Sequence, residues 1–127
     1  MKTVLVVDDE PEVLDVTCKR LTASGYRACG ARDGVEGLKA ARAERPDLIL
    51  LDIMMPGKDG LTMLRELKAD DATARIPIIM LTARGGAEHM FKGEEYGAID
   101  YFIKPCDWQE LLKYIKKYME IAELPSP

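Results

Sequence analysis

The sequence predicts an α/β fold in which helices cover both faces of a mostly parallel β-sheet. Short apolar runs alternate with helical segments five times along the chain, and this rhythm is typical of successive β-α units. The runs consist mostly of Val, Ile and Leu without polar interruption, as in strands that are buried on both faces. Four of the five runs stop at a reactive polar residue, so polar side chains are expected at the strand ends.

The individual elements follow from local signals. Strands are expected at residues 4–7, 26–31, 48–51, 77–81 and 100–103. Helices are expected from Pro11 to a stop at Gly25, from a cap at Asp33 to before Pro46, around Leu61, Leu64 and Leu67, over residues 87–96 before Gly97, and from the capping pair Asp107 and Glu110 to Met119. The first two helices carry the apolar stripes Val13, Leu14, Val16 and Leu21, and Val35, Leu38 and Ala41. The helix at 87–96 is poorly amphipathic and is expected to be the least firmly held.

Residues that can carry chemistry directly follow the apolar runs. VLVV is followed by Asp8 and Asp9, LILL by Asp52, IIML by Thr82 and YFI by Lys104. If these runs are parallel strands, their carboxyl ends lie along one edge of the sheet, where open α/β folds bind ligands. Three carboxylates, a hydroxyl and an ammonium in one pocket suit a divalent cation and a phosphoryl group.

Length and composition indicate one ordinary domain. The chain has 127 residues and a formal net charge of −4, so it has room for a single core and lacks the basic excess of a nucleic-acid-binding domain. We expect residues 1–122 to form the domain and residues 123–127, which contain LPSP, to be a tail or the start of a linker.

The amino terminus and the cysteines favour a cytoplasmic location. The apolar run in MKTVLVVDDE is too short for a signal peptide or a membrane span. Cys18, Cys29 and Cys106 are odd in number and widely spaced, so we expect reduced packing residues rather than a disulfide framework or a structural zinc site.

Four motifs cover essentially the whole chain in a fixed order: VLVVDDE, LDIMMPGKDG, MLTA and YFIKP. Together they resemble the CheY-like receiver domain of two-component response regulators. The resemblance implies a doubly wound, flavodoxin-like (βα)5 three-layer sandwich with a parallel five-stranded sheet of order 2-1-3-4-5. It also implies a phosphorelay domain rather than an enzyme that turns over a separate substrate.

The resemblance assigns the acidic residues to Mg²⁺-dependent phosphoryl transfer. Asp52 matches the phosphoacceptor, and Asp8, Asp9, Asp52 and the backbone carbonyl of Met54 match the metal ligands. Asp9 is favoured for direct coordination and Asp8 for contact through water, although the residues alone leave the reverse assignment open. Mg²⁺, for which Mn²⁺ can substitute, and Lys104 would neutralise the phosphoryl oxygens that repel an attacking carboxylate.

The same resemblance implies a conformational switch. Thr82 matches the switch hydroxyl, and Tyr101 matches the aromatic residue that changes rotamer when this hydroxyl moves toward the phosphoryl group. The peptide bond between Lys104 and Pro105 is expected to be cis, which would aim the ammonium into the pocket. The expected readout is the surface formed by the fourth helix, the fifth strand and the fifth helix.

The implied donor is a histidine kinase or a histidine phosphotransfer protein whose phosphohistidine supplies the phosphoryl group; Asp52 would later lose this group to water. The output would be a downstream domain or protein target, and direct binding of nucleic acid or a membrane is not expected. Two points stay open at the level of sequence. The chain could be a single-domain relay or the amino-terminal receiver of a longer regulator, and it could dimerise on phosphorylation.

Other interpretations explain fewer of the residues. Asp8, Asp9 and Glu10 could simply be acids at a positive helix end, but this does not explain why other reactive residues share their edge. A haloacid dehalogenase-like phosphatase would have a second acid two residues after its nucleophile, whereas Asp52 is followed by Ile53 and Met54. A flavin-binding module would need a Ser/Thr-rich phosphate loop where this chain has DDEPE.

Overall fold

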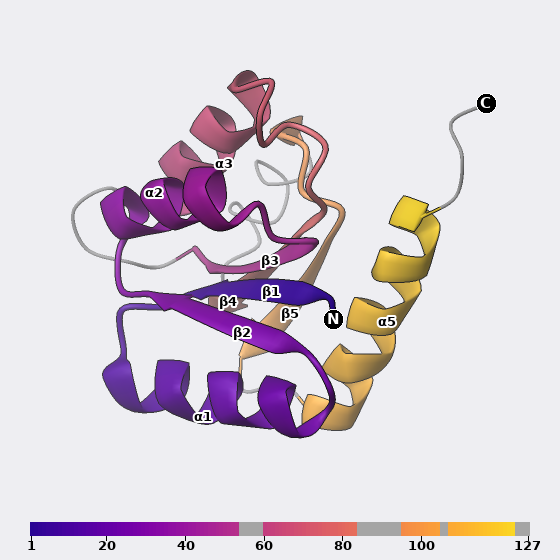
Figure 1. The fold of residues 1–127 in the computed structure, drawn as a ribbon. Coiled ribbons are helices and arrows are strands. Elements are labelled where there is room, and N and C mark those ends of the chain that lie inside the picture. Colours follow the sequence, from indigo (N-terminus) through magenta and orange to yellow (C-terminus); the bar gives the residue numbers. More distant parts are fainter. Residues whose placement is uncertain (54–59, 84–94, 105–106, 124–127) are drawn as a thin grey trace.

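The computed structural model describes residues 1–53, 60–83, 95–104 and 107–123. These residues form a five-stranded parallel sheet between two layers of helices (Figure 1). The predicted doubly wound α/β fold is therefore confirmed. The helix expected at residues 87–96 falls almost entirely outside the described residues.

Strands and helices alternate along the chain. The elements are β1 (Thr3–Val7), α1 (Pro11–Ala23), β2 (Arg27–Ala31), α2 (Gly34–Glu44), β3 (Leu48–Asp52), α3 (Gly60–Ala69), β4 (Ile78–Ala83), β5 (Asp100–Lys104) and α5 (Trp108–Glu123). Neighbouring strands are parallel, in the order β2-β1-β3-β4-β5. This is the order that the resemblance implied, and it puts β1 and β3 side by side at the centre of the sheet.

The core is divided between the two faces of the sheet. Successive side chains of a strand point to opposite faces, and α2 and α3 cover one face while α1 and α5 cover the other (Figure 1). The first face buries Leu5, Val7, Ile49, Leu51 and Met80 against Leu38, Met63, Leu64 and Leu67. The second face buries Val4, Val6, Leu48, Leu50 and Ile79 against Leu21, Leu111, Ile115 and Met119. Each large apolar side chain that is fully buried stabilises the fold by roughly 1.5–3 kcal/mol.

Local capping fixes the helix ends. The carboxylate of Asp33 accepts a hydrogen bond from the amide of Glu36 at 2.8 Å at the start of α2. α1 ends before Gly25, whose φ of +94° is a left-handed conformation that glycine adopts at little cost. Asp107 accepts a hydrogen bond from the amide of Gln109 at 2.9 Å at the start of α5. The predicted caps at Asp33 and Asp107 and the predicted stop at Gly25 are confirmed.

The predicted apolar stripes are wrong at two positions. Val16 in α1 is 48% exposed and Val35 in α2 is 51% exposed, whereas Leu21 and Leu38 of the same stripes are buried. Each helix rests on the sheet along a narrow line, so residues at the margin of a stripe keep contact with water.

The helices of the described part are amphipathic, and none of them has the length and apolar character needed to cross a membrane.

Candidate functional site

Charged side chains are buried at the carboxyl edge of the sheet. Asp8 directly follows β1 and Asp52 ends β3, and both continue runs of buried apolar residues. Asp8 is 1% exposed and Asp52 is 3% exposed. Burying a carboxylate is costly unless a cation or hydrogen-bond donors compensate its charge. The two aspartates therefore need a positive charge close by.

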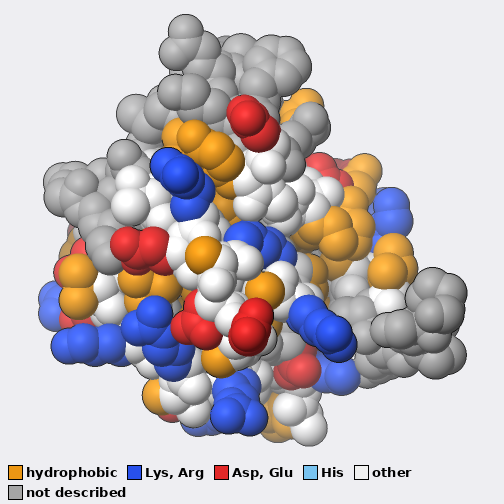
Figure 2. Space-filling view, turned by 90° about the horizontal axis from the view of Figure 1, so that it is seen from above, with side chains coloured by type: hydrophobic (Ala, Val, Ile, Leu, Met, Phe, Trp, Pro, Cys, Tyr) orange, Lys and Arg blue, Asp and Glu red, His pale blue; other side chains and the backbone are white. Residues whose placement is uncertain are grey.

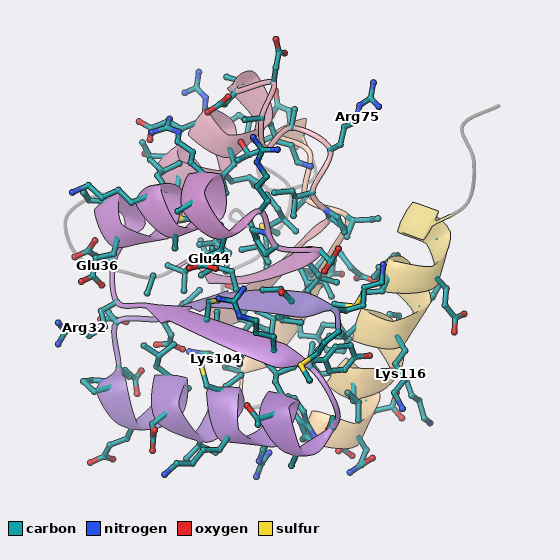
Figure 3. All side chains as sticks on the ribbon, in the orientation of Figure 1. Arg32, Glu36, Glu44, Arg75, Lys104 and Lys116 are labelled. Carbon is teal, nitrogen blue, oxygen red and sulfur yellow. The ribbon has the colours of Figure 1, made fainter. Side chains whose placement is uncertain are left out.

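Lys104 supplies this charge from the end of β5. Its Nζ donates hydrogen bonds to Oδ2 of Asp8 at 2.9 Å and to Oδ2 of Asp52 at 3.2 Å. Because β4 separates β5 from β3, the lysine side chain reaches past a neighbouring strand, and it lies between the sheet and α1 (Figure 3). Burial alone lowers the pKa of Lys104, but the hydrogen bonds and charges of Asp8 and Asp52 outweigh burial and raise this pKa overall. Lys104 is therefore a charged ammonium at neutral pH.

An acidic group lies where β1 passes into α1. Asp8, Asp9 and Glu10 each offer one carboxylate oxygen within 4.8 Å of the other two. The second oxygen of Asp8, Oδ1, accepts a hydrogen bond from the amide of Glu10 at 3.0 Å, so the turn itself orients the buried carboxylate. Asp9 is half-buried and Glu10 is exposed. Clustered carboxylate oxygens are the ligands that Mg²⁺ prefers, so the donor set fits the expected metal.

Glu10 is a member of this acidic group that was not predicted as a ligand. The sequence indicated only that Glu10 could be an acid at a positive helix end. It does occupy that position, because it directly precedes α1. In the structure, the Glu10 amide donates a hydrogen bond to the Asp8 carboxylate, and this tight turn places the Glu10 carboxylate near those of Asp8 and Asp9. The uninterrupted run DDE was the available signal in the sequence.

Thr82 and Tyr101 occupy different positions relative to this site. Asp52 pairs with Leu81 across β3 and β4, and the amide of Ile53 donates to the carbonyl of Leu81 at 3.0 Å. Thr82 follows Leu81 and is fully buried, so it lies at the same edge as Asp52, as predicted. Tyr101 lies three residues before Lys104 on the outermost strand and is 36% exposed. The site therefore combines Asp8, Asp52 and Lys104 in direct contact, with Thr82 nearby and Tyr101 farther out.

Some predicted features lie outside the described residues. They are the backbone carbonyl of Met54, expected at the metal, and Pro105, whose bond to Lys104 was expected to be cis. These two assignments stay predictions.

A groove of about 610 Å³ between α1 and α5 reaches the site and was not predicted. Its lining includes Val13, Val16, Trp108 and Leu111, and Lys104 also borders it. The guanidinium of Arg20 lies 5.8 Å from the centre of the Trp108 ring. The groove combines two helices from opposite ends of the chain, so no local sequence pattern could have indicated it.

Comparison with known proteins agrees with this geometry. The sequence profile of the response regulator receiver domain matches residues 4–116. The chain is 40% identical over 116 residues to the DNA-binding dual master transcriptional regulator RpaA of Synechocystis sp., with 91% of this chain covered. It is 41% identical over 115 residues to the phosphate regulon transcriptional regulatory protein PhoB of Pseudomonas aeruginosa, again with 91% of this chain covered.

A solved structure shows the same fold. The CheY-like response regulator receiver domain protein of Methanospirillum hungatei has a TM-score of 0.91 and 30% sequence identity, and the match covers 97% of each chain. The chain spans about half the length of the curated relatives it matches, 48% of RpaA and 50% of PhoB. The profile match covers most of the chain, and the strand order is the one that the motifs implied. The chain belongs to the response regulator receiver domains of two-component signal transduction.

Proposed function

We propose that Asp52 accepts a phosphoryl group from a phosphohistidine of a histidine kinase or a histidine phosphotransfer protein, and that the reaction requires Mg²⁺. The observation that carries this proposal is the Asp52 carboxylate itself, which is buried at a strand end with the Lys104 ammonium at 3.2 Å. A carboxylate with only a packing or solubility role would not need to be buried beside an ammonium group. The acidic group of Asp8, Asp9 and Glu10 at the same sheet edge supports the requirement for a cation.

In the transfer step, a carboxylate oxygen of Asp52 attacks the phosphorus atom. The P–N bond of the phosphohistidine breaks, and its electron pair stays on the imidazole nitrogen of the donor. Lys104 holds the attacking carboxylate in place and offers positive charge to the phosphoryl oxygens, which is how phosphoryl transfer is mainly catalysed. The product is an acyl phosphate on Asp52.

Bound Mg²⁺, or Mn²⁺ in its place, would supply further neutralisation of the phosphoryl oxygens. Asp9 would hold it directly, Asp8 through water, and Asp52 and the Met54 carbonyl would complete the protein ligands. The hydrogen bonds of Asp8 fit the indirect role, because one of its carboxylate oxygens already accepts from the Glu10 amide and the other from Lys104. Glu10 is a further acid that can attract the cation to the site.

Release of the group is proposed to use water. A water oxygen attacks phosphorus, the bond between phosphorus and the Asp52 oxygen breaks, and inorganic phosphate leaves. The Asp52 carboxylate is restored. The domain would thus catalyse its own phosphorylation and dephosphorylation without turning over a separate substrate.

We propose that phosphorylation is read out through Thr82 and Tyr101. Thr82 lies at the edge that would carry the phosphoryl group, and a group with about two negative charges is a strong hydrogen-bond acceptor for its hydroxyl. Tyr101 on the outer strand would change rotamer in response, and the surface of β5, α5 and the expected fourth helix would change with it. A cis bond between Lys104 and Pro105 would keep the ammonium aimed at Asp52.

The output is proposed to be a further domain or a protein target. RpaA and PhoB are transcriptional regulators by name, and this chain corresponds to about half of each. Residues 1–122 would be the receiver, residues 123–127 a tail or linker, and phosphorylation could drive dimerisation. Direct binding of nucleic acid by this domain is not proposed, because its net charge is −4 and acidic and basic side chains are interspersed on the face shown in Figure 2. The free thiols of Cys18 and Cys29 fit a cytoplasmic location.

The proposal is tested by intact mass after incubation with Mg²⁺ and acetyl phosphate. We expect the wild type to gain one phosphoryl group, Asp52→Asn to gain none, and the exposed control Asp71→Asn to behave as wild type. Omission of Mg²⁺ should abolish the gain. An equal gain in Asp52→Asn would refute the assignment of the acceptor.

A further inference from the structure

We infer that Gly60 is a positioning residue for Asp52, an inference that rests on the proposed phosphoryl transfer. Gly60 is the first residue of α3 and is buried. Its amide donates a hydrogen bond to the carbonyl of Ile53 at 3.2 Å. The beginning of α3 therefore lies directly against the end of β3, where Asp52 stands.

There is no room for a side chain at position 60. A Cβ atom there would lie 2.5 Å from the carbonyl oxygen of Asp52 and 2.6 Å from Cα of Ile53. Real Cβ atoms essentially never approach other heavy atoms within 3.0 Å. Both of these contacts are with backbone atoms, so no change of rotamer can relieve them. A side chain at this position must push α3 and the end of β3 apart.

Such a displacement would act on the carboxylate of Asp52. On the side facing β4, the end of β3 is held by the hydrogen bond from the Ile53 amide to Leu81. On the side facing α3, the backbone of Gly60 fixes its position. The carboxylate oxygen lies 3.2 Å from Nζ of Lys104, so a shift of a few tenths of an ångström changes the geometry from which it attacks. Misplacement of a reacting group by about 1 Å can reduce a rate by roughly a hundredfold.

Gly37 offers a matched control in the same fold. It is also a buried glycine of a helix, and a Cβ there would lie 2.6 Å from Cε of Met63. This neighbour is the far end of a flexible side chain, which can move aside. A Cβ atom would thus be similarly crowded at Gly37 and Gly60. Only at Gly60 are its nearest neighbours backbone atoms, of Asp52 and Ile53, which cannot move aside.

The test compares wild type, Gly60→Ala and Gly37→Ala with acetyl phosphate and saturating Mg²⁺, well below the melting temperature of each protein. The maximal rate constant of phosphoryl gain, the half-saturating donor concentration and the melting temperature are measured separately. We expect Gly60→Ala to lower the maximal rate by about tenfold or more, with a half-saturating concentration within about twofold of wild type. Gly37→Ala should keep the wild-type rate within about twofold, whatever its melting temperature.

A second variant separates positioning from simple crowding. The nearest side-chain atom to a Cβ at position 60 is Cδ1 of Ile53, at 3.1 Å. Ile53→Val removes this atom but leaves both backbone contacts, so the double variant with Gly60→Ala should stay slow. Recovery of the wild-type rate in the double variant would overturn the positioning role. An unchanged maximal rate in Gly60→Ala would overturn it while leaving the proposed function intact, whereas absence of phosphoryl gain in the wild type would overturn both.

Discussion

The two edges of the sheet carry the same types of charged residue in different surroundings. At the amino edge of the sheet, Nζ of Lys2 lies 4.0 Å from Asp47, and the two side chains are 42% and 40% exposed. At the carboxyl edge, Lys104 lies 2.9 Å from Asp8 and 3.2 Å from Asp52, whose side chains are 1% and 5% exposed. Lysine and aspartate thus form ion pairs at both edges, but only at the carboxyl edge are the aspartate side chains buried.

The difference separates an exposed ion pair at the amino edge from buried charges at the carboxyl edge. An exposed ion pair contributes about 0–1 kcal/mol and costs little to form. Burying carboxylates carries a large desolvation penalty, and one ammonium offsets only one of the two negative charges at Asp8 and Asp52. The carboxyl edge is therefore a poor device for stability. The same arrangement fits the proposed function, in which the site would receive a cation and a phosphoryl group.

The largest expected effect comes from removing the ammonium at the carboxyl edge. Lys104→Met would remove the ammonium that contacts both buried carboxylates, Asp8 and Asp52, so we expect the free energy of unfolding to fall by about 2–3 kcal/mol. Urea denaturation in the absence of divalent cations measures this loss, and the rate of phosphoryl gain should fall as well. Full retention of both stability and rate would contradict the role given to Lys104.

The next effect concerns the cation. Because the acidic group brings carboxylates together, we expect Mg²⁺ to stabilise the folded state by about 1.4 kcal/mol at tenfold above its Kd. Thermal unfolding with MgCl₂, against NaCl at equal ionic strength, measures the shift. The shift should disappear in the double variant Asp9→Asn, Glu10→Gln. A melting temperature that does not change with millimolar Mg²⁺ would contradict a metal site.

A smaller effect is expected at the amino edge of the sheet, where a carboxylate connects a strand to a helix by a hydrogen bond. At the start of β5, Asp100 accepts a hydrogen bond from the hydroxyl of Tyr118 on α5. Burial, with the hydrogen bond and charge of Asp100, raises the pKa of Tyr118 to about 12. Tyr118→Phe should cost about 1 kcal/mol near pH 8 because this hydrogen bond is lost.

The same tyrosine gives a pH dependence with a definite sign. The folded state holds the Tyr118 proton more tightly than the unfolded state, in which the pKa is about 10. Its contribution to stability is therefore fully present below pH 10 and is lost as the pH rises toward about 12. The difference between wild type and Tyr118→Phe in urea denaturation should shrink over this range. A difference that stays constant with pH would show that the hydrogen bond does not control the titration.

The smallest effect is expected for the exposed pair. Lys2→Met removes the charge that faces Asp47, and the free energy of unfolding should change by no more than about 0.5 kcal/mol. The same urea series that measures Lys104→Met provides the comparison. A loss as large as that of Lys104→Met would erase the distinction between the two edges.

The strands and the residues at their ends were predictable because they depend on local pattern and on chain direction. Four continuous apolar residues precede Asp8 and Asp52, and parallel strands must bring such ends to one edge. The sheet order came from the resemblance to receiver domains rather than from the residues themselves. The exposure of Val16 was missed because a stripe does not show how wide its contact with the sheet will be.

What sequence could not show depends on contacts between distant atoms. The residue pattern placed Lys104 at the same edge as the aspartates, but not its hydrogen bonds to both of them. The motif LDIMMPGKDG contains both Asp52 and Gly60, but only the structure shows that Gly60 lies against the carbonyl of Asp52. The local pattern identified the polar groups, but the close packing of α3 against the end of β3 could be seen only in the structure.

Chemical trapping of the phosphorylated residue tests the central claim most directly. An acyl phosphate is reduced by borohydride to an alcohol, so a phosphorylated aspartate becomes homoserine, which peptide mass spectrometry can locate. After incubation with Mg²⁺ and acetyl phosphate, we predict homoserine at position 52. Trapping at another acid such as Asp8 or Asp9, or no trapping in a protein that has gained phosphoryl mass, would contradict the account.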